Sequence, residues 1–280
     1  MSSIQSLKNG DLQGALSKLQ AEIRDNPAEP KHRIFLFQLL CVLGQWDRAL
    51  NQLNILRDIS PDSMTLVQAY QETLVCESLR AAVFSGARSP LLFGEPEPWM
   101  AMMLQSLQLY ATGSKDEADS LRTQALELAP TTGAELHLHP LTSADSSEAA
   151  ASDDPINIEW MADADSRIGP FLEAIVKGKY YWIPFQRIQT MIFERATDLR
   201  DLVWLPARFA WTNGGEAVGF VPARYPTSES STDDHIRLGW KTTWNEDSHG
   251  VFLGQGQRIL ATDIDDYPLT RIAKVVFQIG

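Results

Sequence analysis

The stretch GQWDRALNQLNILRDISP, residues 44–61, determines the fold that we predict for the first half of the chain. It begins with a glycine, has an alanine five residues later and ends on a proline twelve residues after that. The same three residue types recur at the same steps once before it and once after it. The three triplets are Gly10, Ala15 and Pro27; Gly44, Ala49 and Pro61; and Gly113, Ala118 and Pro130. The first two are offset by 34 residues, and the third follows after 69, one more than twice that period.

A period of about 34 residues is typical of tetratricopeptide repeats, which are helical hairpins stacked side by side. In each hairpin the glycine forms the turn between two helices, the small alanine lets the helices approach, and the proline ends the second helix. Apolar residues at helical spacing follow the first two glycines. We therefore predict a TPR-like helical repeat domain over residues 1–133, with turns at Gly10, Gly44 and Gly113.

The repeat is interrupted after its second unit. The residue one period after Gly44 is Ser78, and residues 64–85 have the composition of one long helix. Residues 88–99 follow, and they are too rich in proline and glycine to be helical. This segment carries apolar side chains that include Phe93 and Trp99, so we expect an ordered loop that packs against the second half of the chain.

An acidic segment separates the two halves. The chain has a formal net charge of −12, and residues 134–159 hold six acidic residues without a lysine or arginine. Half of the net charge therefore lies in these 26 residues. Charged, alanine- and serine-rich segments of this kind are typically flexible and solvated, so we predict an acidic linker over residues 134–158.

Residues 159–280 have the pattern of a tryptophan-rich α+β domain. We predict a helix over 167–177 that is capped by Asp163 or Asp165, followed by a short aromatic strand over 180–184. A hairpin turn is predicted at 213–215, where Asn-Gly-Gly tolerates positive φ. Further strands are expected at 188–194, 236–244, 250–252, 257–262 and 272–278. The fold class expected for the whole chain is α+β in two domains, the second built on a mainly antiparallel, strongly bent sheet.

Composition excludes several classes of function. A net charge of −12 argues against a nucleic-acid-binding protein, and no apolar run is long enough to cross a membrane. The start of the chain lacks the pattern of a secretory signal, and two isolated cysteines suit a reducing compartment, so we expect a cytoplasmic location. The pair His137 and His139 lacks a third zinc ligand nearby in sequence. We expect no metal, no cofactor and no enzymatic activity, because no catalytic constellation is present.

Several motifs distributed along the chain are similar to those of a known family. They are Phe93-Gly94-Glu95-Pro96 with Trp99; residues 163–170; Asp198-Leu199-Arg200-Asp201 with Trp204; Trp211 with Asn213-Gly214-Gly215; and Pro222 with Arg224-Tyr225. Together they resemble the ImpE family, also called TagJ, of accessory proteins in bacterial type VI secretion. The resemblance implies a cytoplasmic, non-catalytic adaptor that binds an N-terminal helix of the contractile-sheath subunit TssB. It also implies a connection, direct or indirect, to the ClpV ATPase that disassembles the sheath.

Aromatic and arginine side chains are the candidate partner-binding residues, because such residues carry most of the energy at protein interfaces. They are Phe93, Trp99, Trp182, Trp204, Trp211, Arg224 and Tyr225. An alternative hypothesis is a small-molecule-binding protein or enzyme, with a pocket in the second domain lined by the last five of these residues. The sequence favours the adaptor, because an enzyme needs a base, a nucleophile or a metal that the motifs do not supply.

Overall fold

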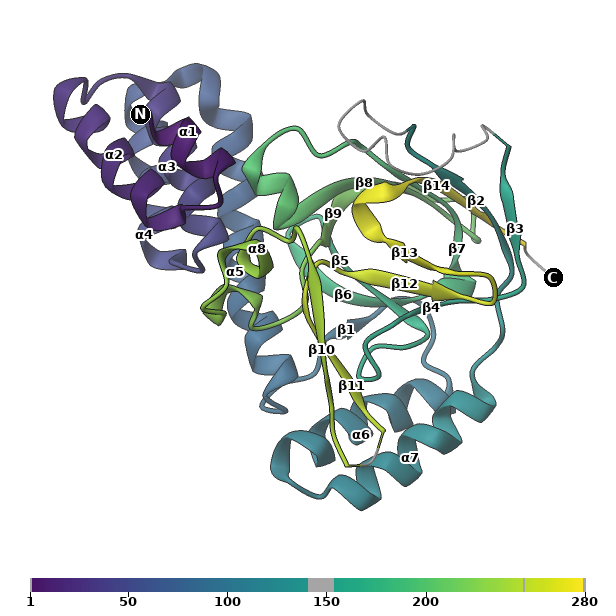
Figure 1. Cartoon of the computed structure of the whole chain (residues 1–280). Helices are drawn as coiled ribbons and strands as arrows, with labels where there is room; N and C mark the ends of the chain where they lie inside the picture. Colours follow the sequence, from purple (N-terminus) through teal and green to yellow (C-terminus); the bar gives the residue numbers. More distant parts are fainter. Residues whose placement is uncertain (1, 141–153, 249, 279–280) are drawn as a thin grey trace.

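The computed structural model describes residues 2–140, 154–248 and 250–278 (Figure 1). In Figure 1 the helices of residues 3–84 stack at the upper left of a bent sheet, and those of residues 98–128 lie below it. Both groups share a core with one face of this sheet, and a smaller sheet packs against the opposite face. The helices of the first half are α1 (Ser3–Lys8), α2 (Leu12–Asp25), α3 (Pro30–Val42), α4 (Trp46–Ile59), α5 (Met64–Phe84), α6 (Pro98–Thr112) and α7 (Lys115–Leu128).

The three predicted turn glycines all separate consecutive helices. Gly10 lies between α1 and α2, Gly44 between α3 and α4, and Gly113 between α6 and α7. Their φ angles are +74°, +66° and +93°, which is the left-handed region that glycine adopts at the least cost. The turns and the long helix α5 are therefore confirmed, whereas the assignment to the tetratricopeptide class stays a prediction.

Nine strands form the main sheet, in the order β1-β6-β5-β9-β8-β7-β14-β2-β3. Every neighbouring pair is antiparallel except β1 with β6, so the α+β class with a mainly antiparallel sheet is confirmed. The strands are β1 (Leu91–Leu92), β2 (Ala134–Leu138), β3 (Ile156–Ile158), β5 (Phe171–Val176), β6 (Lys179–Pro184), β7 (Ile188–Phe193), β8 (Trp204–Trp211), β9 (Glu216–Pro222) and β14 (Ile272–Phe277).

Two smaller sheets complete the fold. The three-stranded sheet contains β4 (Met161–Asp163), β12 (Ile259–Thr262) and β13 (Asp266–Pro268) and covers the inner face of the main sheet. The two-stranded sheet pairs β10 (Thr242–Glu246) with β11 (Phe252–Gly256), and this hairpin extends toward α6 in Figure 1. The short helix α8 (Asp234–Arg237) precedes β10.

The period-two alternation of strand residues divides the main sheet between two cores. On β8, Trp204 faces the helices, whereas Leu205 and Phe209 face the three-stranded sheet. The helix-side core is continuous from α2 through α6 to β5, β6 and β8. A single hydrophobic cluster therefore joins the predicted repeat domain to the sheet.

The loop predicted over 88–99 packs against the sheet, as expected. Its strand β1 pairs in parallel with β6, and the Phe93 amide donates a hydrogen bond to the Trp182 carbonyl over 3.2 Å. The Phe93 ring lies 4.4 Å from that of Trp211, measured between centroids. These contacts place the loop at one edge of the main sheet.

Three sequence predictions are wrong in detail. The expected helix over 167–177 is instead a turn at 167–170 followed by the strand β5, which is buried along its whole length. The expected linker over 134–158 forms β2 and β3 at its two ends, and its residues 141–153 lie outside the described part. The segment 236–244, expected as one strand, ends α8 and begins β10. A strand buried on both faces has an unbroken apolar run, which sequence periodicity cannot distinguish from a buried helix.

Candidate functional site

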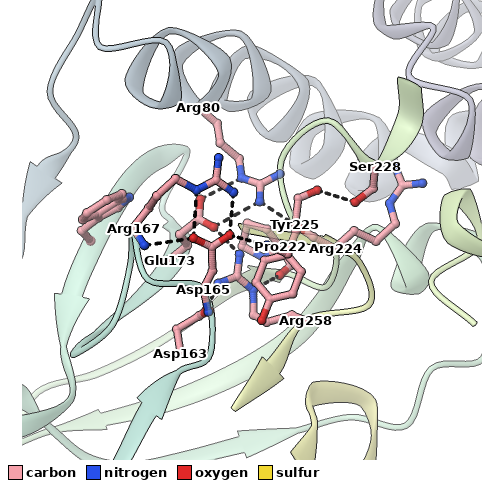
Figure 2. Close-up of polar contacts among 12 residues, drawn as sticks. Arg80, Asp163, Asp165, Arg167, Glu173, Pro222, Arg224, Tyr225, Ser228 and Arg258 are labelled. Atoms are coloured by element: carbon pink, nitrogen blue, oxygen red, sulfur yellow. Dashed lines mark hydrogen bonds and ion pairs between the residues drawn. The ribbon is translucent and has the colours of Figure 1, made fainter. Parts of the chain in front are cut away.

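A group of charged side chains is buried where α5 meets the sheet, and we name it the buried charge cluster (Figure 2). Glu173 of β5 is its centre. The other members come from α5, the end of β4 and the loop after it, and the segment before β12. They are Arg80, Asp163, Asp165, Arg167 and Arg258.

Glu173 is bound by two arginines and a tyrosine. Arg80 donates from Nε to Oε1 over 2.7 Å and from Nη2 to Oε2 over 3.1 Å. The Arg258 guanidinium and the Tyr180 hydroxyl also donate to this carboxylate. Burial alone would raise the pKa of Glu173, but the two guanidiniums outweigh it and hold the pKa at about 2. The carboxylate is therefore ionised throughout the neutral range.

The two aspartates of the cluster are not helix caps, so that prediction is wrong. Asp163 ends β4 and accepts from Arg258, and burial raises the pKa of Asp163 to about 7 despite this partner. Asp165 accepts from Nε of Arg167 over 2.8 Å and from the backbone amide of Gly254 over 2.9 Å. These bonds connect the smaller sheets to the loop after β4.

A further arginine joins the helices to the sheet by backbone contacts. Arg224 follows β9, and its Nη1 donates to the carbonyl of Val42 at the end of α3 over 2.9 Å. It also donates to the carbonyls of Cys41 and Arg237. Burial lowers the pKa of Arg224 to about 10, which leaves the guanidinium charged at neutral pH. A cation that binds carbonyls at the C-terminal end of a helix also interacts favourably with the helix dipole.

The buried charge cluster is a structural clamp in this conformation. The side chains of Asp163, Glu173 and Arg258 have no exposed surface, so a substrate has no route to them. Arg258 pairs with both carboxylates and Arg80 supplies a second positive charge to Glu173, because a buried ion is costly unless it is paired. The arrangement holds α5 in a fixed position against β5.

An open apolar groove lies beside this clamp, between α5 and the outer face of the sheet. Its volume is about 400 Å³. The lining comes from α5, the β5–β6 turn, β8 and β9, and it includes Ala69, Thr73, Ile175, Val218 and Phe220. Charges of both signs, from Glu72, Lys177, Glu194 and Arg208, also line it. We name this feature the α5 groove.

Val218 is the most exposed apolar residue of the α5 groove. Its exposed fraction is 70%, and the neighbouring outer face of β7 carries Ile192, which is 41% exposed. Arg208 of β8 lies between these two residues in the sheet. It is opposite Ile192 of β7 on one side and opposite Val218 of β9 on the other. The sheet therefore presents uncovered apolar surface next to the groove.

The structure buries six of the seven predicted partner-binding residues. Trp99, Trp182, Trp204, Trp211, Arg224 and Tyr225 are each at most 5% exposed, and Phe93 is half-buried. Phe93 and Trp211 lie together at the β1 edge, whereas Arg224 and Tyr225 lie near the cluster. These side chains belong to the interior of the protein. Their role in partner binding stays a prediction, and their low exposure does not favour it. The pocket expected among Trp182, Trp204, Trp211, Arg224 and Tyr225 does not form, because these residues are buried in different places. Trp182 and Trp204 belong to the helix-side core, whereas Trp211 belongs to the core on the other face of the sheet.

Sequence reasoning missed the residues that the structure exposes. Trp160, Trp240 and Trp244 are 38–46% exposed, but composition alone could not tell them from buried tryptophans. Glu173 had a detectable signal, because it is a lone carboxylate within the apolar run of β5.

The described residues contain neither a metal-binding cluster nor a helix able to span a membrane. Within residues 2–140, 154–248 and 250–278, no cluster of three or more His, Cys, Asp or Glu side chains is arranged to hold a metal ion. A search of the same residues finds no helix with the length and apolar character needed to span a membrane.

Comparison with known proteins identifies relatives over the whole chain. A family model described as ImpE protein matches residues 156–276. The type VI secretion system accessory component TagJ of Pseudomonas aeruginosa is 39% identical over 272 residues, which cover 97% of this chain and 89% of the relative. The crystal structure of protein VPA1032 from Vibrio parahaemolyticus shares the fold, with a TM-score of 0.84 at 22% identity over 99% of this chain and 98% of that one. On the identity and coverage of the TagJ match, together with the family model, the chain belongs to the ImpE family.

Proposed function

We propose that this protein is an accessory component of a bacterial type VI secretion system that acts as a non-catalytic adaptor in the cytoplasm. It binds an N-terminal helix of the sheath subunit TssB and helps to link the sheath to the ClpV ATPase for disassembly. The observation that carries the accessory role is the 39% identity to TagJ over 97% of the chain. The buried, mutually neutralised charges of the clamp support a role without catalysis.

The α5 groove is the surface that best suits an amphipathic helix. Such a helix binds by placing apolar side chains, spaced three or four residues apart, into an apolar groove. Small residues of α5, Ala69 and Thr73, leave space for these anchors, and Val218 offers exposed apolar area. The charges of both signs along the groove can pair with the polar face of the helix and fix its direction.

Calorimetric titration of the full chain with a synthetic peptide of the first TssB helix tests the function. Binding should be detectable at concentrations of about 100 μM or below, and it should depend weakly on salt because its main contacts are apolar. A titration that stays silent well above ~100 μM would refute the adaptor function.

A matched pair of variants tests the location. Val218→Lys places a charge in the α5 groove and should weaken the peptide at least about tenfold, the equivalent of ~1.4 kcal/mol. Val75→Lys is the control, because Val75 lies on α5 outside the groove lining and is 68% exposed, close to the 70% of Val218. Equal affinity of the two variants would place the helix elsewhere while leaving the adaptor function intact.

A further inference from the structure

A second cavity lies on another part of α5, and we name it the arginine cavity. Its volume is about 260 Å³, and it opens between α4, α5, the loop after β4 and the loop after β9. The side chains that matter for its chemistry are Trp46, Glu77, Arg80, Phe84, Arg167 and Glu229. It is therefore lined by two guanidiniums, two carboxylates and two aromatic rings.

Both guanidiniums keep hydrogen-bonding capacity for a ligand. Arg167 uses Nε and Nη2 on Asp165, and Nη1 has no hydrogen-bond partner within the described part of the chain. Arg80 uses Nε and Nη2 on Glu173, and Nη2 also donates to the Arg224 carbonyl. The Nη1 of Arg80 forms an ion pair with Glu77 at 3.6 Å, a distance too long for a hydrogen bond. Two donor groups thus remain available on residues that line one cavity.

Both guanidiniums contact the same aromatic ring. The guanidinium carbon of Arg167 lies 5.0 Å from the centroid of the Phe84 ring, and that of Arg80 lies 5.8 Å from it. Contacts of this kind hold a guanidinium against the ring face. Because Asp165 and Glu173 hold the two side chains as well, the donor groups are fixed in place before any ligand arrives.

The two carboxylates differ in how far they are engaged. Glu77 accepts a hydrogen bond from Nε1 of the buried Trp204 over 2.6 Å. The Glu229 carboxylate makes no ion pair or hydrogen bond within the described residues. The cavity therefore offers a carboxylate of its own in addition to the two arginine donors, with Trp46 and Phe84 as apolar walls.

We propose that the arginine cavity binds a free α-amino acid with a large apolar side chain. The ligand carboxylate accepts hydrogen bonds from Nη1 of Arg80 and Arg167, its ammonium pairs with Glu229, and its side chain contacts the two rings. A phosphate dianion carries no ammonium to pair with Glu229, so the Glu229 carboxylate would repel it. A purely apolar ligand would leave guanidinium groups buried without partners, which is costly. The volume of about 260 Å³ lies below that of pockets for drug-sized ligands and suits a single amino acid.

Calorimetry and thermal denaturation of the full chain test the proposal with four probes. Phenylalanine should bind and raise the melting temperature, since a ligand that binds only the folded state stabilises it. N-acetylphenylalanine lacks the ammonium, phenylalanine amide lacks the carboxylate, and both should bind at least about tenfold more weakly. Inorganic phosphate, the fourth probe, should not compete with phenylalanine.

Three variants locate the site. Ala81→Leu should fill the cavity from an exposed position on its lining, and Glu229→Gln should remove the ammonium partner. Each should weaken phenylalanine at least about tenfold. Ala101→Leu is the matched control, because Ala101 is an exposed alanine of α6 away from the cavity, and it should bind as the unchanged protein does.

Several outcomes would overturn the proposal. They are an absence of phenylalanine binding at ~10 mM, equal binding of the amide, competition by phosphate, or unchanged affinity in Ala81→Leu. Unfolded variants are recognised by their melting curves, and in that case the comparison of the four probes on the unchanged protein decides. The result is independent of the TssB peptide titration, so failure of one proposal is distinguishable from failure of the other.

Discussion

The ion pair between Arg80 and Glu173 allows a quantitative test of the clamp between helices and sheet. We consider the single variants Arg80→Met and Glu173→Gln and the double variant that combines them. Methionine keeps much of the length and apolar character of the arginine stem, and glutamine keeps the shape of the glutamate. Each single variant leaves a buried ionic partner only partly compensated.

The cost follows from the burial of the pair. Removing one member of a buried ion pair typically costs about 3–5 kcal/mol of unfolding free energy. The pKa of Glu173 points the same way, because burial would raise it but Arg80 and Arg258 lower it to about 2. We therefore expect each single variant to lose about 3 kcal/mol.

The double variant should lose less than the sum of the two single losses. Neither side chain is then left facing an unpaired charge at this contact, so the coupling energy should be about 2 kcal/mol, within the range for contacting residues. Urea unfolding followed by tryptophan fluorescence measures all four free energies. Equal slopes against urea concentration would show that the variants change stability and not compactness.

An exposed ion pair of the same chain serves as the control. Arg208 and Glu194 lie 3.4 Å apart with side chains that are 68% and 57% exposed. The same cycle with Arg208→Met and Glu194→Gln should give a coupling energy below about 0.5 kcal/mol, as for other surface pairs. A buried-pair coupling as small as that of the control would refute the clamp.

Two further predictions concern acid stability and turn geometry. Because the pKa of Glu173 is lower in the folded state than in the unfolded state, its contribution is present above pH ~4.5 and is lost as the pH falls toward 2. The stability difference between the unchanged protein and Glu173→Gln should shrink over that interval in urea titrations, and a constant difference would contradict the assigned pKa. Gly44→Ala should cost more than Gly113→Ala, by about 1 kcal/mol or more in the same assay. Both have positive φ, but only at Gly44 would a Cβ lie 2.4 Å from a side-chain carbon of Glu229, so equal losses would show that Glu229 moves away freely.

Local signals account for the parts of the fold that the sequence predicted. The turn glycines at Gly10, Gly44 and Gly113 act within a few residues, and so does the hairpin turn at 213–215. The wrong helix prediction over 167–177 arose because the apolar pattern of this segment is ambiguous. The run that forms β5 is apolar on both faces because helices cover one side and the three-stranded sheet covers the other, and such a run lacks the alternation that marks a half-buried strand.

The candidate sites depended on contacts between distant residues, and no single-sequence pattern specifies those. Arg80 and Glu173 are 93 positions apart, and Glu173 and Arg258 are 85 apart. The tryptophans proposed as partner contacts are polar at one atom and apolar elsewhere, so both cores and interfaces use them. Trp204 shows the outcome, because its Nε1 is satisfied by Glu77 inside the core.

Helix α5 contributes residues to the buried charge cluster, to the α5 groove and to the arginine cavity. Ala69 and Thr73 line the α5 groove, Phe84 lines the arginine cavity, and Arg80 belongs to both the cavity and the clamp. A groove binds a helix tightly only when its walls are positioned before binding, since ordering them at that moment would reduce the affinity. The clamp on Glu173 provides that positioning for α5. A ligand that engages Arg80 therefore acts on the same helix that forms the groove, and any effect of the ligand on peptide affinity must be matched by an equal effect of the peptide on ligand affinity.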